Sequence, residues 1–170
     1  MDEQNMRVPP NHADAEKSVL SCMMQDREAL SLAFELLGAD DFYQPAHREI
    51  FEGMHQLNSQ GMPVDLVTVD EELSRRGTLE GVGGTGYLIE LSQFLPSSVN
   101  ARAYVQIVDE KATLRRMIKA TGEIASACYE QADPVSDILG VAEKSILTSS
   151  CAVMRERRSS ILPMFFRIHI

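Results

Sequence analysis

The chain has 170 residues, of which 44% are hydrophobic, and its formal net charge is −9 at pH 7. That is enough apolar material for one buried core, and an acidic chain is poorly suited to neutralising the phosphates of DNA. The three cysteines (Cys22, Cys128, Cys151) form no CxxC pair, the polar N-terminus does not resemble a secretory signal, and no apolar run reaches the roughly 20 residues of a membrane helix, so we expect a cytoplasmic protein with protein partners.

The first elements along the chain are an arm and two helices. Residues 1–12 contain Pro9 and Pro10 and no apolar periodicity, so we interpret them as an N-terminal arm. Apolar residues then recur three and four positions apart over 13–24 and 28–37, which predicts two amphipathic helices. Gly38 follows the second helix at a position typical of a left-handed residue that ends a helix.

Three further helices complete an expected helical head of residues 13–97: residues 45–60, 68–77 and 87–94. Pro45 is a favourable first residue of a helix. Thr68 and Glu71 have the spacing of a capping box, and Gly77 is placed to end the same short helix. Pro96 is expected to end the last one.

Residues 98–149 predict a long antiparallel helical hairpin, so the fold class is all-α, with a compact helical head followed by this hairpin. Asn100 is a suitable N-cap for a helix that reaches Gln131, and Asp133 and Pro134 begin the second helix after a very short connection. Each helix carries one apolar stripe. The stripes either pack against the preceding helices or accept a further partner, and the sequence leaves both alternatives open.

Residues 150–170 have a different composition, with four arginines against one glutamate, followed by a largely apolar end. The acidic charge therefore belongs to residues 1–149. We assign no structure to this divergent basic and apolar tail. It fits an end that docks on a partner, and it fits equally what remains of a truncated or frame-shifted reading frame.

The glycine-rich segment resembles one nucleotide-binding motif in its letters alone. Gly81 to Gly86 match the pattern G-x-G-x-x-G, but a charged helical run precedes them where a dinucleotide site needs a buried strand. We interpret this segment as a flexible turn between two short helices. No segment resembles the P-loop pattern G-x-x-x-x-G-K-[ST], so nucleotide hydrolysis is not expected of this chain by itself.

Other candidates for chemistry lack partners in the sequence. His47 and His55 stand eight residues apart, about 80° around a helix, whereas zinc sites favour pairs three or four apart, so we expect both on a polar face. Cys22 and Ser97 have no visible general base. The sequence thus predicts no catalytic, metal-binding or cofactor-binding residues, and the carboxylates are expected to form a solvated face. Arg115 with its basic neighbours Arg116 and Lys119 is either a solvated helix face or a contact for an acidic partner.

Several short sequence segments, here called phrases, occur in a fixed order and together identify a family more specifically than any single motif. The phrases are Arg7–Pro10, Ala15–Leu20, Asp40–Tyr43, His47–Phe51, Gly61–Asp65, Leu79–Gly84, Tyr87–Leu88 and Leu95–Asn100. Together they resemble the N-terminal domain of the bacterial replicative DNA helicases of the DnaB family, over about residues 7–147. The resemblance does not extend to the family's C-terminal RecA-like motor, which binds ATP and Mg²⁺.

The resemblance implies a collar domain that acts in DNA replication through partners. In that family, N-terminal domains form a trimer of dimers within a hexamer, hairpins pack between subunits, and the collar presents its hairpin region to primase. The hairpin residues expected to bind partners are Ile107, Leu114, Arg115, Ile118, Ile124, Ile138, Leu139 and Ile146. The alternative is a stand-alone phage- or plasmid-like protein that binds and modulates a host helicase or primase.

Overall fold

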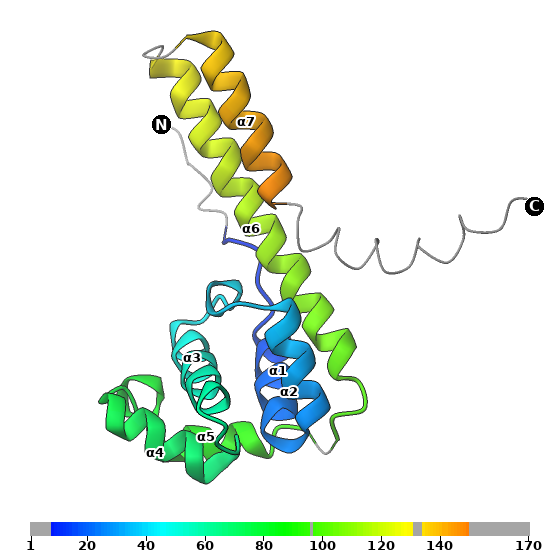
Figure 1. Cartoon of the computed structure of the whole chain (residues 1–170), viewed down its shortest axis with the longest axis vertical. Coiled ribbons are helices and arrows are strands. Elements are labelled where there is room, and N and C mark those ends of the chain that lie inside the picture. The colour runs from blue at the N-terminus through cyan, green and yellow to red at the C-terminus, as the bar shows by residue number, and fades with distance from the viewer. Residues whose placement is uncertain (1–7, 96, 131–133, 150–170) are drawn as a thin grey trace, which may run out of the picture. The chain divides into compact units, whose positions relative to one another are not determined.

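The computed structural model describes residues 8–95, 97–130 and 134–149, and every regular element in these ranges is helical (Figure 1). The all-α prediction is confirmed. The elements are α1 (Ala13–Gln25), α2 (Arg27–Leu36), the 3₁₀ helix η1 (Ala39–Asp41), α3 (Pro45–Ser59), α4 (Leu66–Arg76), the 3₁₀ helix η2 (Glu80–Val82), α5 (Gly84–Ser92), α6 (Ala101–Glu130) and α7 (Val135–Ser149). The expected tail, the end of a helix at Pro96 and most of the arm lie outside the described residues.

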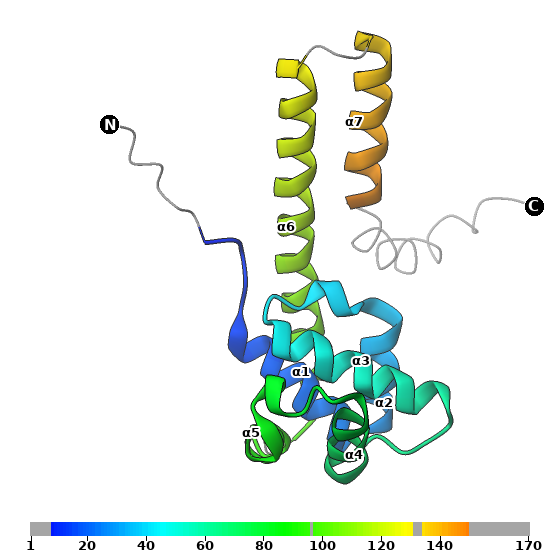
Figure 2. The same cartoon turned by 90° about the vertical axis from the view of Figure 1, so that its left-hand side faces the viewer.

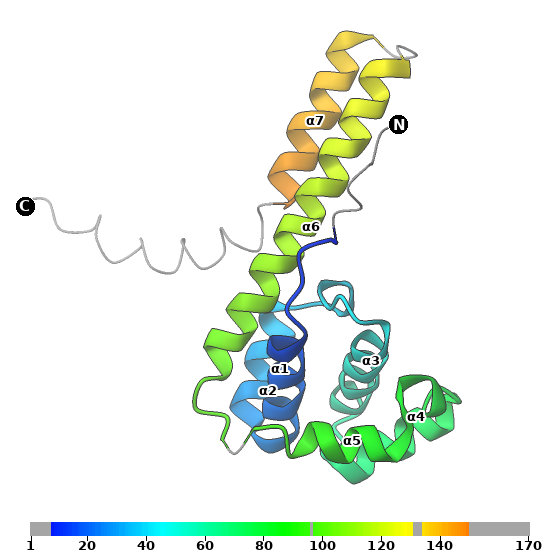
Figure 3. The same ribbon diagram turned by 180° about the vertical axis from the view of Figure 1, so that it is seen from behind.

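One compact unit comprises residues Asn11–Ala112, which we call the head. Helix α1 packs against α2, α3 and α5, while α4 packs against α3 and α5 (Figure 3). Fully buried side chains from four of these helices, including Leu20, Ile50, Leu73 and Leu88, form the centre of the core. This arrangement follows from the apolar residues that recur at helical spacing on one face of each helix.

Helix ends in the head show which local signals were interpreted correctly. Gly77 is left-handed with φ of 72° and ends α4, as predicted. The predicted capping box was wrong, because Asp65 is the N-cap of α4 and Thr68 is its third helical residue. The prediction for Gly38 was also wrong. It has φ of −113°, because the chain continues in extended backbone and Gly38 then begins η1.

The second compact unit comprises residues 1–10 and 113–170, so the two units divide within α6. The sequence placed that boundary between residues 97 and 98. The difference arises because Val105 and Val108, on the first turns of α6, belong to the buried core of the head. Within the second unit, α7 runs antiparallel beside α6 (Figure 2), as the short connection predicted.

Candidate functional site

The hairpin exposes an apolar surface on both of its helices. The large apolar side chains of α6 beyond Ala112 and of α7 that are at least 43% exposed are Leu114, Met117, Ile118, Tyr129, Val135, Leu139, Val141, Ile146 and Leu147. No α7 residue whose side chain is described is buried. Large apolar side chains exposed in this number are typical of an interaction surface, and we call these nine residues the hairpin stripe.

The predicted partner-binding residues fall into three groups. Leu114, Ile118, Leu139 and Ile146 belong to the hairpin stripe, while Ile124 and Ile138 are half-buried. Ile107 packs against the core of the head, whereas the other residues belong to the second unit. The role of all these residues in partner binding stays a prediction.

Arg115 has a structural role inside its own unit. Its Nη1 donates a hydrogen bond of 2.8 Å to the carbonyl oxygen of Pro10, which ties the N-terminal segment to α6. The neighbouring Arg116 donates to Thr113 Oγ1 at 2.8 Å, and Lys119 lies 3.9 Å from Glu123. The basic cluster therefore already has contacts within the chain. Lys119 is exposed, whereas Arg115 and Arg116 are half-buried.

A buried polar network joins three helices of the head. Glu16 on α1 and His47 on α3 are each 2% exposed, and His47 Nδ1 lies 2.6 Å from Glu16 Oε2. Because an ionised carboxylate only accepts hydrogen bonds, Nδ1 is the donor. His47 Nε2 lies 2.7 Å from the hydroxyl of Tyr87 on α5. The prediction that His47 lies on a polar face was wrong.

Glu16 also anchors the backbone at the start of α3. Its Oε1 accepts from the amide of Tyr43 at 2.7 Å and its Oε2 from the amide of Gln44 at 3.3 Å. Burial by itself raises the pKa of Glu16, but the hydrogen bonds from His47, Tyr43 and Gln44 outweigh it and hold the pKa below its usual value. The carboxylate therefore remains ionised inside the core, and it is not part of the solvated acidic face that the sequence predicted.

A periodic signal for both residues was present in the sequence. His47 precedes Ile50, Phe51 and Met54 by three, four and seven positions, which puts it on the buried face of α3. Glu16 has the same relation to Leu20 and Met23 on α1. Their mutual contact spans 31 residues, so the sequence pattern alone could not pair them.

The glycine-rich segment is a turn only in part, because Gly81 and Val82 belong to η2 and α5 begins at Gly84, earlier than the sequence predicted. Gly83, which separates the two helices, and Gly84 have φ of 107° and 71°, in the left-handed region that favours glycine. A Cβ added at Gly83 would lie only 2.9 Å from Tyr87 Cβ. Glycine at this position therefore leaves room for Tyr87 in the first turn of α5. The segment before it is helical, which removes the structural context of a dinucleotide site.

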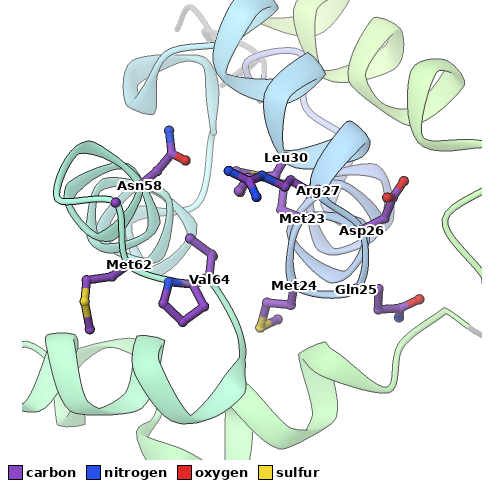
Figure 4. Close-up of a pocket in the computed structure, with 11 residues that line it drawn as sticks. Met23, Met24, Gln25, Asp26, Arg27, Leu30, Asn58, Met62 and Val64 are labelled. Carbon is purple, nitrogen blue, oxygen red and sulfur yellow. The ribbon is translucent and has the colours of Figure 1, made fainter.

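A pocket of about 420 Å³ lies in the head between the α1–α2 corner and the segment that follows α3 (Figure 4). Met23 and Met24 face it from one side, and Met62 and Val64 from the other. Its lining includes neither histidine nor cysteine, and its carboxylate, Asp26, caps α2 by accepting from the amides of Glu28 and Ala29. The pocket therefore contains no group of residues suited to catalysis.

Within the described parts of the chain, no three histidine, cysteine or carboxylate side chains are grouped so that they could bind a metal ion. None of the helices described is both long and apolar enough to cross a membrane.

Residues 8–110 match the family described as the DnaB-like helicase N terminal domain. The chain belongs to this family. Among curated relatives, the replicative DNA helicase DnaC of Bacillus subtilis (strain 168) is 42% identical over 146 residues, which cover 86% of this chain and 32% of that protein. The replicative DNA helicase DnaB of Geobacillus stearothermophilus is 40% identical over 85% of this chain and 32% of its own length. This DnaB-like chain thus spans about a third of these relatives.

Two solved structures have a similar fold. The crystal structure of the N-terminal domain of DnaB helicase from Mycobacterium tuberculosis aligns with a TM-score of 0.77 and 36% identity, over 83% of this chain and 99% of that one. The structure of a DnaB-like replicative helicase and its interactions with primase aligns with a TM-score of 0.66 and 24% identity, over 87% of this chain and 35% of that one. The second likeness concerns the fold alone.

Replacing His47 in this DnaB-like domain should be strongly destabilising. His47→Leu leaves the buried Glu16 carboxylate without its side-chain donor, so we expect a loss of about 3 kcal/mol in the free energy of unfolding, measured with urea at pH 7. His55→Leu is the matched control, since His55 is an exposed histidine on the same helix, and it should cost less than about 0.5 kcal/mol. Equal effects of the two substitutions would contradict this role of His47.

The same network predicts a pH dependence of stability. Because the pKa of Glu16 is lowered in the folded state, its contribution is present above the unfolded value of 4.5 and is lost as pH falls through the folded pKa. The difference in free energy of unfolding between wild type and Glu16→Gln should therefore be fully developed at about pH 6 and shrink below about pH 4.5. The exposed control Glu71→Gln should show no such trend, and a difference that grows with acidity would refute the assignment.

Proposed function

We propose that this chain acts as a collar domain of a replicative DNA helicase, in which the hairpin mediates oligomerisation and helps to recruit primase during DNA replication. The observation that supports this proposal best is the exposed hairpin stripe. Membership of the DnaB-like N-terminal family supplies the context, because the similar curated proteins are replicative DNA helicases.

The hairpin stripe has the geometry of a helix-to-helix interface. Met117 and Ile118 lie three and four residues after Leu114 on α6, and Leu139 and Ile146 lie two turns apart on α7. Full burial of one such side chain contributes about 1.5 to 3 kcal/mol. A second hairpin offers the same apolar face in return, so a two-fold pair of copies would cover both stripes.

Primase is the second partner in the proposal. One helicase with a similar fold has been solved together with its interactions with primase, and the chain aligns with it over 87% of its length. ATP-dependent unwinding, with ATP and Mg²⁺, belongs to the motor domains of an assembled helicase in this proposal. We assign no cofactor to the residues of this chain and place its action in the bacterial cytoplasm.

Self-association through the stripe is directly measurable by analytical ultracentrifugation at micromolar concentration. We expect the wild-type chain to form a dimer or a larger species. The double substitution Ile118→Asp and Leu139→Asp places two charges in the proposed interface, and we expect it to raise the dissociation constant by at least about tenfold.

The matched control for self-association is Ser126→Asp, because Ser126 is an exposed polar residue on the same part of α6. It introduces a carboxylate outside the stripe and should leave the dissociation constant within about twofold. A strictly monomeric wild type over this concentration range would rule out the collar function for this chain.

Primase binding is testable by fluorescence anisotropy with labelled primase from Bacillus subtilis, the organism of a 42% identical relative. We expect saturable binding that Leu139→Asp weakens by at least about tenfold and Ser126→Asp does not. The same experiment repeated with the full-length helicase distinguishes the alternative function: a chain that enters or blocks helicase hexamers is a modulator. Binding to neither protein would contradict both functions.

A further inference from the structure

A groove of about 990 Å³ runs along the outer side of α2 in the head, separate from the hairpin unit. Its lining comes from α2 and its N-cap, from the turn before α6 and from the first residues of α6: Asp26, Arg27, Glu28, Ala29, Ser31, Leu32, Glu35, Ser98, Val99, Ala101 and Arg102. Ala29 and Ala101 are 4% and 7% exposed and belong to one small apolar cluster. They give the groove an apolar base.

Two carboxylates are spaced along one face of α2. Glu28 and Glu35 are seven residues apart, which is two helical turns or about 10 Å, and Leu32 lies on the same face between them. Both glutamates are exposed, and neither side-chain carboxylate forms a hydrogen bond or an ion pair with any residue in the described ranges. Asp26 differs, because its carboxylate caps α2 and accepts from Ser98 Oγ at 3.4 Å.

An aliphatic side chain with little contact of its own stands in the same groove. Val99 is 86% exposed although it lies in the turn that leads into the buried start of α6. Such exposure of a β-branched residue contributes nothing to folding of the head. Together with Leu32 it supplies apolar surface to the lining of the groove.

The net charge of the head also favours a basic partner. Residues 11–112 contain seventeen aspartates and glutamates against seven lysines and arginines. A field of this sign attracts basic partners and repels nucleic acid. Arg27 and Arg102 also line the groove, so its surface is not uniformly acidic. A partner must therefore place its basic residues opposite Glu28 and Glu35.

We propose that this groove binds a basic amphipathic helix of a partner protein. Two lysines or arginines seven residues apart on that helix meet Glu28 and Glu35, and aliphatic residues of the same helix contact Leu32 and Val99. The spacing of the two basic residues matches that of the two glutamates, because both helices advance about 10 Å in two turns. This surface is independent of the hairpin stripe and does not rest on the collar function.

The test uses the full chain and a synthetic helical peptide of about 18 residues, made of alanine with leucines and lysines in this spacing. We expect amide chemical-shift changes confined to α2 and residues 97–102. The double substitution Glu28→Lys and Glu35→Lys should weaken binding at least about tenfold and should create binding of a matched peptide with glutamates in place of lysines. Val99→Ser, which leaves the charge unchanged, should weaken binding about threefold.

The control is Glu71→Lys with Glu80→Lys, two exposed glutamates elsewhere on the head that give the same change in net charge. This control should alter the affinity less than about twofold at 0.15 M salt, where distant charges are screened. Equal losses in both double variants would show general attraction to an acidic surface and overturn the proposal. Shifts on α7, binding of single-stranded DNA in the groove, or a changed sedimentation coefficient of the groove variant would overturn it as well.

Discussion

The head depends on one buried carboxylate. Glu16 projects from α1 and accepts hydrogen bonds from two backbone amides that precede α3 and from the imidazole of His47 within α3. The second ring nitrogen of His47, Nε2, lies 2.7 Å from the hydroxyl of Tyr87 on α5. The orientations of three helices are thus coupled to one polar group, and each partner is costly to remove because the others would be left unsatisfied in a low-dielectric interior. Apolar packing alone would constrain these angles less precisely.

Lys17, next to Glu16 in the chain, continues this connection at the surface of the head. Its Nζ lies 3.3 Å from Glu90 on α5 and within 5.7 Å and 5.5 Å of the ring centroids of Tyr87 and Phe94. Successive residues of α1 are therefore linked to α5 in two ways: Glu16 indirectly, through His47, and Lys17 directly, through Glu90 and the ring of Tyr87. The head closes its own core by these means, whereas the hairpin leaves most of its apolar surface uncovered.

Much of this organisation could be predicted from the sequence, and the exceptions have physical causes. Apolar periodicity gave the existence and approximate bounds of the main helices, because each helix buries one face. The capping box was placed three residues too late, since Thr68 is also a good N-cap and only the backbone shows that Asp65 occupies that position. The spacing of His47 from His55 does not show that it is buried, whereas its spacing from Ile50 and Met54 puts it on the buried face of α3. The groove on α2 was not predicted, since its walls come from residues about seventy positions apart in the sequence.

The two units differ in the kind of interaction that their surfaces favour. The head has an excess of ten negative charges, whereas residues 1–10 and 113–170 together hold nine basic and eight acidic residues. Acidic heads repel one another, so the proposed association between copies would be driven by the nearly neutral, apolar hairpin. Salt screens that repulsion and strengthens apolar contact between copies, but it weakens the attraction of a basic helix to Glu28 and Glu35. The two proposed surfaces, the hairpin stripe and the α2 groove, should therefore respond to ionic strength in opposite directions, and this difference distinguishes self-association from binding of a basic partner.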